Sequence, residues 1–179
     1  MSALRQLLER NRQHAVGHSE GRPAVEPTLR AVILACVDHR SDPAHVLALA
    51  PNEAAVVRNP GGRVTESFIH QLAVLATVAA VEGMDVGFEL IVMHHSDCGV
   101  SRLASPHHAE LVASMFGVVG TAPHTVLDPE VTVVEDIATL RAHPLVPGTL
   151  VVGGLVHDLD TGRVRAVVEP APLAMGGRR

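Results

Sequence analysis

Short apolar runs separated by longer, partly polar segments organise the chain from residue 30 onward. The runs 31–37, 54–58, 88–94 and 149–156 are rich in Val, Leu, Ile and Ala, and the first and third are almost entirely apolar. Such runs are typical of parallel strands that are covered on both faces. An Asp-Thr-Gly turn leads into residues 162–169, and these residues predict a short strand at the edge of the sheet.

Two segments between the runs have the features of helices. Residues 65–83 begin at Thr65, a candidate N-cap followed by an acid, and end at Gly83, a natural stop. Residues 129–143 predict a second long helix. We therefore expect an α/β fold with a mainly parallel four-stranded sheet, an additional edge strand, and helices on both faces.

The N-terminal segment has a different pattern. Residues 3–14 place apolar side chains at helical spacing on an otherwise charged segment, and this narrow stripe needs a surface to lie on. Residues 17–27 are rich in Gly, Pro and polar residues, as linkers are. We expect a helical arm with its linker at 1–29, packed on a partner subunit, and one domain at 30–179. The apolar residues of the stripe are Leu4, Leu7 and Leu8.

Composition and charge exclude several classes of protein. A hydrophobic fraction of 47% with 18% charged residues is ordinary for a globular α/β protein of 179 residues. A net charge of −5 and an aromatic fraction of 2% argue against a nucleic-acid partner. The sequence contains no apolar stretch long enough for a membrane span and no signal-peptide core. We expect a cytoplasmic protein without a membrane partner.

The only two cysteines, Cys36 and Cys98, both lie at or just after the end of a predicted strand. His94 and His95 stand shortly before Cys98. Because parallel strands end at the same edge of a sheet, we expect the cysteines and a histidine to meet there. Cys and His are good zinc ligands, and a site with three protein ligands keeps a position open for catalysis.

Other interpretations of these residues stay open at this point. The cysteines could be small buried apolar residues, a disulfide, or a redox-active thiol pair, although their placement at strand ends favours zinc. The spacing alone does not decide between His94 and His95. The histidines that we interpret as ordinary surface or core residues are His107, His108, His124, His143 and His157.

Three motifs resemble the β-class carbonic anhydrases. They are C-V-D-H-R at 36–40, V-V-R-N-P-G-G at 56–62 and H-S-D-C-G at 95–99. The family has the zinc motifs C-x-D-x-R and H-x-x-C. The resemblance runs from about residue 30 to about residue 168 and includes G-L-V-H-D-L-D-T-G-R-V near the end.

The resemblance implies a zinc enzyme that converts CO₂ and water reversibly to bicarbonate and a proton. Asp38 and Arg40 would be its catalytic pair, and Asp38 could also bind the metal in a closed form of the site. Adjacent side chains of an extended segment point opposite ways, so His94 should face away from the metal. The family further implies a homodimer or a larger homo-oligomer. The zinc ligands that it implies are Cys36, His95 and Cys98.

The chain departs from the family's pattern near the expected substrate cleft. Ala50 stands where many members carry Gln, and Leu49 and Ala55 stand where many carry aromatic residues. The cleft should therefore be wider. Hydrolysis of CS₂ or COS by the same zinc site is one alternative function. A non-catalytic zinc-binding or redox-sensing protein is another, favoured if Asp38 fills the fourth metal position permanently.

Overall fold

A five-stranded sheet forms the centre of the computed structural model, which describes residues 2–16, 24–84, 87–116 and 124–174. The strand order is β2-β1-β3-β4-β5; the first four strands are parallel, and β5 runs antiparallel to β4. The predicted fold class is thereby confirmed. The strands are β1 (Ala31–Cys36), β2 (Ala54–Asn59), β3 (Glu89–His95), β4 (Val151–His157) and β5 (Val164–Pro172).

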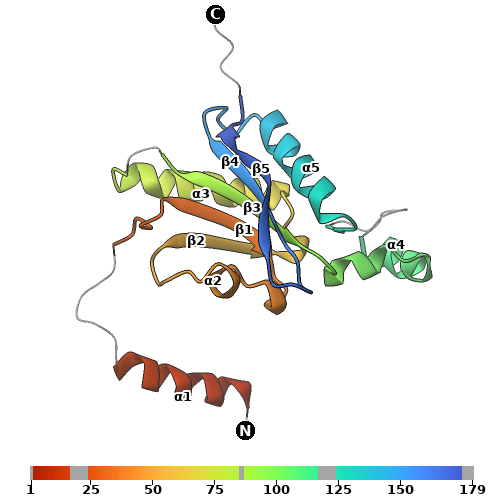
Figure 1. Cartoon of the computed structure of the whole chain (residues 1–179), viewed down its shortest axis with the longest axis horizontal. Coiled ribbons are helices and arrows are strands. Elements are labelled where there is room, and N and C mark those ends of the chain that lie inside the picture. Colours follow the sequence, from red (N-terminus) through yellow and green to blue (C-terminus); the bar gives the residue numbers. More distant parts are fainter. Residues whose placement is uncertain (1, 17–23, 85–86, 117–123, 175–179) are drawn as a thin grey trace, which may run out of the picture.

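Two long helices, α3 (Glu66–Val81) and α5 (Pro129–Ala142), pack on one face of the sheet (Figure 1). Alternate residues of β1 and β3 point to this face, because successive side chains of a strand point to opposite sides. Their aliphatic side chains form the main core and hold the strand ends in place. The residues that β1, β3, α3 and α5 contribute to this main core include Val32, Leu34, Phe68, Ile69, Leu90, Val92, Val133, Ile137 and Leu140.

The other face of the sheet has a smaller core. Ile33, Ala35 and Met93 point to this side and pack against the short helix α2 (Pro43–Val46) and the residues that follow it. Helical structure thus lies on both faces, with the two long helices on one of them. The segment after β1 is held close to the strand's carboxyl end in this way.

The long helices begin and end close to the predicted residues. Thr65 caps α3 by accepting a hydrogen bond from the backbone N–H of Phe68 at 3.1 Å. Gly83, with φ 68°, follows the end of the helix in the left-handed conformation that glycine favours. Asp128 caps α5 by accepting from the backbone N–H groups of Glu130 and Val131. These local signals explain why the boundaries were predictable.

The sequence patterns did not predict the shorter helices that follow β1, β2 and β3. Each is shorter than about three turns, too short for a periodic apolar pattern to stand out. Several of them form part of the loops at the carboxyl edge of the sheet, where the candidate site lies. They are η1 (His39–Ser41), α2, η2 (Pro60–Gly62), η3 (Gly99–Ala104), η4 (Pro106–His108) and α4 (Ala109–Phe116).

The N-terminal helix α1 (Ala3–Val16) lies apart from the sheet (Figure 1). This element confirms the predicted helix, and none of its residues is buried. The predicted linker at 17–27 lies partly outside the described residues, which omit 17–23. The division into an arm and one domain stays a prediction.

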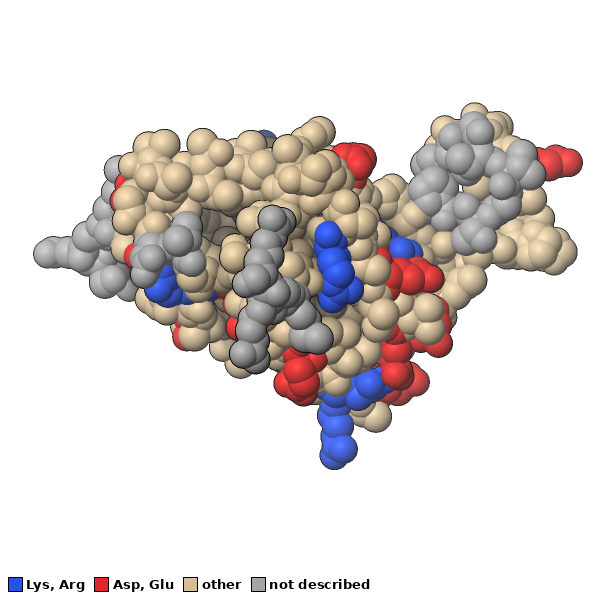
Figure 2. All heavy atoms as spheres, turned by 90° about the horizontal axis from the view of Figure 1, so that it is seen from above, with Lys and Arg blue, Asp and Glu red and all other residues tan. Residues whose placement is uncertain are grey.

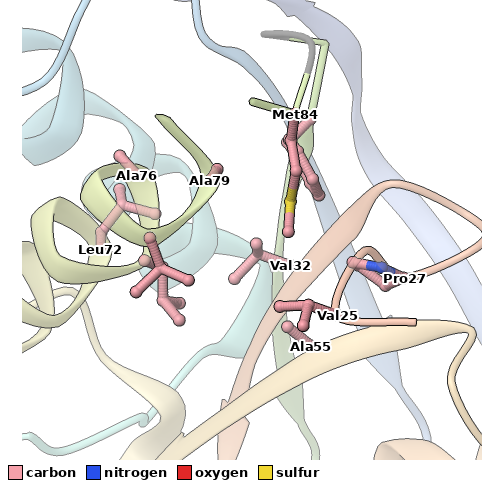
Figure 3. A pocket seen from close by; sticks show the side chains of 11 residues that line it. Val25, Pro27, Val32, Ala55, Leu72, Ala76, Ala79 and Met84 are labelled. Carbon is pink, nitrogen blue, oxygen red and sulfur yellow. The ribbon is translucent and has the colours of Figure 1, made fainter. Parts of the chain in front are cut away.

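An apolar hollow of about 160 Å³ lies between α3 and the first residues of β1 and β2 (Figure 3). Because it lies near the amino ends of the strands, it is separate from the carboxyl edge that carries Cys36. The residues labelled around it are Val25, Pro27, Val32, Ala55, Leu72, Ala76, Ala79 and Met84.

Among the described helices none is both long and apolar enough to cross a membrane. On the face that Figure 2 shows, basic residues are scattered among uncharged and acidic ones and do not gather into one patch. A basic patch of that kind is the usual mark of a nucleic-acid site.

Candidate metal centre

The ends of β1 and β3 bring Cys36, His95 and Cys98 together. The two strands pair in parallel, so Cys36 at the end of β1 lies beside the residues that end β3. All three side chains are buried, and their possible ligand atoms lie within 4.8 Å of one another. The two sulfur atoms are 3.8 Å apart. The expected meeting of strand ends is confirmed, and the cluster can hold a metal ion.

The imidazole of His95 is oriented and protonated so that Nε2 can bind a metal ion. Its Nδ1 lies 2.9 Å from the carbonyl oxygen of Ser96, which can only accept, so Nδ1 carries the proton. Nε2 then has a free lone pair, and within the described residues this buried atom has no hydrogen-bond partner. A buried nitrogen without a partner is costly unless something binds it, so the donor set fits a metal.

The two cysteines share a proton in the absence of a metal. A hydrogen bond from Cys98 lowers the pKa of Cys36 far below its usual value, because the neighbouring S–H stabilises the thiolate. The same hydrogen bond, together with burial, raises the pKa of Cys98. A divalent cation would replace the shared proton and stabilise both thiolates, so metal binding and proton release would be coupled here.

Asp38 and Arg40 form a bidentate pair next to this cluster. Arg40 donates from Nε to Oδ1 of Asp38 at 3.0 Å and from Nη2 to Oδ2 at 2.7 Å. These hydrogen bonds hold the pKa of Asp38 well below its usual range, so the carboxylate stays ionised. The backbone N–H of Asp38 lies 3.4 Å from the Cys36 sulfur. The pair therefore places a fixed anionic acceptor beside a potential metal ligand.

Arg58 has a role in the site that its position in the sequence does not reveal. Its side chain donates to the carbonyl oxygens of Cys36 at 2.9 Å and Asp38 at 2.8 Å, and it pairs with Asp42. It fixes the backbone that carries both the cysteine and the aspartate. The signal was present in the R-N-P-G-G motif, but the motif does not reveal which groups the arginine contacts.

Gly62, from the same motif, lies directly against the backbone of β1. A side-chain carbon at this position would lie 2.8 Å from the backbone nitrogen of Cys36, and the residue has φ 67°. Only glycine fits both the space and the conformation. This close approach sets the position of the η2 segment behind the cysteine.

His94 faces away from the cluster, as the alternation of the strand predicts. Its Nδ1 lies 2.8 Å from the hydroxyl oxygen of Thr132, and its Nε2 lies 3.2 Å from a carboxylate oxygen of Asp136. Asp136 is itself buried and accepts from Arg63 at 3.0 Å. This polar network links β3 to α5 on the sheet face opposite α2. No sequence motif identifies Asp136 or Arg63 as parts of this network.

The five histidines that we interpret as core or surface residues are not part of the metal cluster, although His157 pairs with His95 in the register of β3 and β4. His157 is buried and hydrogen-bonds to the hydroxyl of Ser41 at 2.9 Å, and His107 and His108 are exposed. His124 and His143 are partly buried. These positions agree with their interpretation as core and surface residues.

Comparisons with known proteins agree with this geometry. A family model described as carbonic anhydrase matches residues 31–119. Beta-carbonic anhydrase 1 of Mycobacterium tuberculosis is 27% identical over 93% of this chain and 99% of that protein. The carbonic anhydrase structure from Streptococcus mutans is 31% identical, covers 93% of this chain and 98% of its own, and superposes with a TM-score of 0.76. A carbon disulfide hydrolase of Acidianus is 27% identical over 88% of this chain and 85% of that protein.

Proposed function

Because the chain belongs to the β-carbonic anhydrase family, we propose that it is a zinc enzyme that converts CO₂ and water reversibly to bicarbonate and a proton. The observation that carries this proposal is the convergence of Cys36, His95 and Cys98 in one buried cluster. Two thiolates and an imidazole form a donor set that suits Zn²⁺. The Asp38–Arg40 pair next to the cluster favours turnover over a purely structural metal site.

The roles of the protein groups follow from their contacts. Zinc, when bound, would lower the pKa of a water molecule and so make a nucleophile available. Asp38 would accept a hydrogen bond from this water and orient it toward the carbon of CO₂. Arg40 keeps Asp38 ionised and binds both of its carboxylate oxygens. We propose that release from Arg40 would let Asp38 take the fourth metal position and close the site.

Stopped-flow CO₂ hydration by the zinc-loaded protein, from about pH 6.5 to about pH 9, tests the proposal. The rate should rise with pH, because two thiolates neutralise the charge of Zn²⁺ and make it a weaker activator of water. Asp38→Asn should keep zinc and lose activity by at least about 100-fold. Asp160→Asn, which removes an exposed carboxylate outside the Asp38–Arg40 pair, is the control and should retain activity. A zinc-loaded parent without activity at every pH would refute the proposal.

Hydrolysis of CS₂ or COS is the second candidate function. The similarity to a carbon disulfide hydrolase favours it. Leu49 and Ala50, which are smaller than the residues that many family members carry and which we expect to widen the cleft, are compatible with either linear substrate, whereas Ala55 lines the apolar hollow near the amino ends of the strands. Release of H₂S from CS₂ or COS, together with no measurable CO₂ hydration, would favour this candidate over the first.

We also propose that the chain functions as a homodimer or larger homo-oligomer in the cytoplasm, with residues 1–29 as an arm that packs on a partner subunit. The exposed leucines of α1 support this assembly, because none of the residues of α1 is buried in the single chain. An apolar stripe of this kind is stabilised when a second surface covers it.

A further inference from the structure

Asp97, in the loop between the proposed ligands His95 and Cys98, has an unusual backbone conformation. Its φ of 47° lies in the left-handed region, which aspartate tolerates better than most residues other than glycine. Its carbonyl oxygen accepts a hydrogen bond from Nη2 of Arg40 at 2.9 Å, and its carboxylate accepts from Nη1 at 3.0 Å. Both polar groups of Asp97 therefore bind the same guanidinium.

Arg40 consequently bridges two aspartates. Its Nε and Nη2 bind Asp38, while Nη1 and Nη2 bind Asp97. The guanidinium is planar and rigid, so fixing one edge also fixes the other edge. Because Asp97 belongs to the loop that carries two proposed zinc ligands, it ties the orientation of the Asp38–Arg40 pair to the metal loop.

The Arg40 side chain is partly exposed, so its contact with Asp97, in addition to that with Asp38, restricts its movement. The Arg40 side chain is 38% exposed, so a single ion pair would leave it considerable freedom to move with its partner. Arg102 pairs with the other carboxylate oxygen of Asp97 at 3.2 Å and helps to hold this carboxylate in place. Hydrogen bonds from Arg40 also lower the pKa of Asp97, so its carboxylate is ionised at neutral pH.

We propose that Asp97 is a positioning residue for the proposed reaction. It holds Arg40 in the orientation that keeps Asp38 bound to the guanidinium and away from the fourth metal position. The proposal rests on the proposed function for its catalytic meaning, but the restraint on Arg40 is a property of the chain itself. Without the Asp97 side chain, Arg40 and Asp38 would reorient more readily, and Asp38 would reach the metal more often.

The first experiment measures solvent exchange of the Arg40 Nε–H by NMR, with the signal assigned by its loss in Arg40→Lys. Asp97→Gly keeps access to the left-handed backbone conformation and removes the carboxylate. We expect exchange to accelerate at least about fivefold in Asp97→Gly and by a smaller factor in Asp97→Asn, which keeps a neutral acceptor. Asp160 lines the same surface hollow as Arg40 and Asp97, so Asp160→Asn removes one negative charge nearby and should stay within about twofold of the parent.

The second experiment compares the pH profiles of CO₂ hydration by the zinc-loaded parent and Asp97→Asn. The midpoint should rise by at least about half a pH unit in the variant, because Asp38 would compete more strongly for the metal. A purely structural role would lower the melting temperature without moving this midpoint. Unchanged Nε–H exchange in Asp97→Gly, or an unchanged midpoint in Asp97→Asn, would overturn the positioning role. An inactive parent with faster exchange in Asp97→Gly would refute the proposed function and support the restraint on Arg40.

Discussion

At the scale of single residues, the site depends on three side chains whose buried ligand atoms are best satisfied by a bound cation. Cys36 and Cys98 share a proton, and the lone pair of His95 is buried without a partner among the described residues. The unpartnered His95 nitrogen and the burial of a thiolate both cost free energy in a metal-free chain. A bound Zn²⁺ would remove these costs together, so we expect metal binding to stabilise the fold.

Removal of one donor should therefore release the metal. The purified parent should hold about one zinc per chain, and His95→Ala or Cys98→Ser should lose most of it, because the two remaining donors bind weakly. His94→Ala is a matched control, since the neighbouring imidazole contacts Thr132 and Asp136 on the other side of the strand. Metal analysis by mass spectrometry measures the content. Full zinc content in His95→Ala would show that this ligand assignment is wrong.

The arrangement of some site residues could be predicted from their positions along the sequence. The alternation of strand side chains predicts that His94 and His95 face opposite sides, and the structure agrees. The contacts of Arg58 and Asp136 could not be predicted in this way. Arg58 contacts residues about 20 positions earlier, and Asp136 meets Arg63 and His94 from a distant helix. Such contacts depend on how the elements pack, which spacing along the chain does not specify.

At the scale of elements, the position of η2 against β1 controls the geometry behind Cys36. The backbone at Gly62 approaches the Cys36 nitrogen so closely that no side chain fits there. Arg58, at the end of β2, binds the backbone just beyond the same strand. The elements that carry the proposed ligands are thus held by contacts that involve the backbone itself, which gives them little freedom to shift.

Gly62→Ala should accordingly destabilise the protein more than a substitution at a glycine with the same backbone conformation but open surroundings. Gly162 has φ 68° and nothing within 4 Å of the place where a side-chain carbon would lie, whereas Gly62 has φ 67° and a clash. We expect Gly162→Ala to cost about 1–2 kcal/mol and Gly62→Ala about 3 kcal/mol or more, from the conformational penalty plus overpacking.

Urea unfolding of the two variants measures the difference, and zinc content provides a second readout. Gly62→Ala should also bind zinc less well, because the displaced segment lies against Cys36. Equal losses of stability in both variants would mean that the close approach at Gly62 contributes nothing beyond its backbone conformation.

The longer elements could be predicted from the sequence because their signals are local. The apolar runs gave the strands, and caps such as Thr65 and Asp128 explain where α3 and α5 begin. That both long helices share one sheet face could not be predicted, because this depends on how the chain crosses the sheet between strands. The short helices of the site were missed because they lack a full apolar period.

At the scale of the whole molecule, the described residues leave apolar side chains exposed on several elements, α1 and α3 among them. The stripe on α1 is exposed, and so are valines on the outer side of α3. Isolated exposed apolar residues are common, but a helix that buries none of its residues has little to hold it in place as a single chain. We therefore expect α1 to be stabilised by contacts that a single copy of the chain does not supply.

Replacement of Leu7 by Glu tests this expectation. Leu7 lies on the apolar stripe of α1 and is 59% exposed in the single chain. If a partner subunit covers the stripe, Leu7→Glu places a charge in an apolar interface and should shift the protein toward the monomer. Gln6→Glu adds a similar charge on the opposite side of the same helix and should leave the assembly intact. Sedimentation velocity of the parent and both variants measures the oligomeric state. A monomeric parent would rule out the homo-oligomer, and a dimer unchanged by Leu7→Glu would show that the arm does not hold it together.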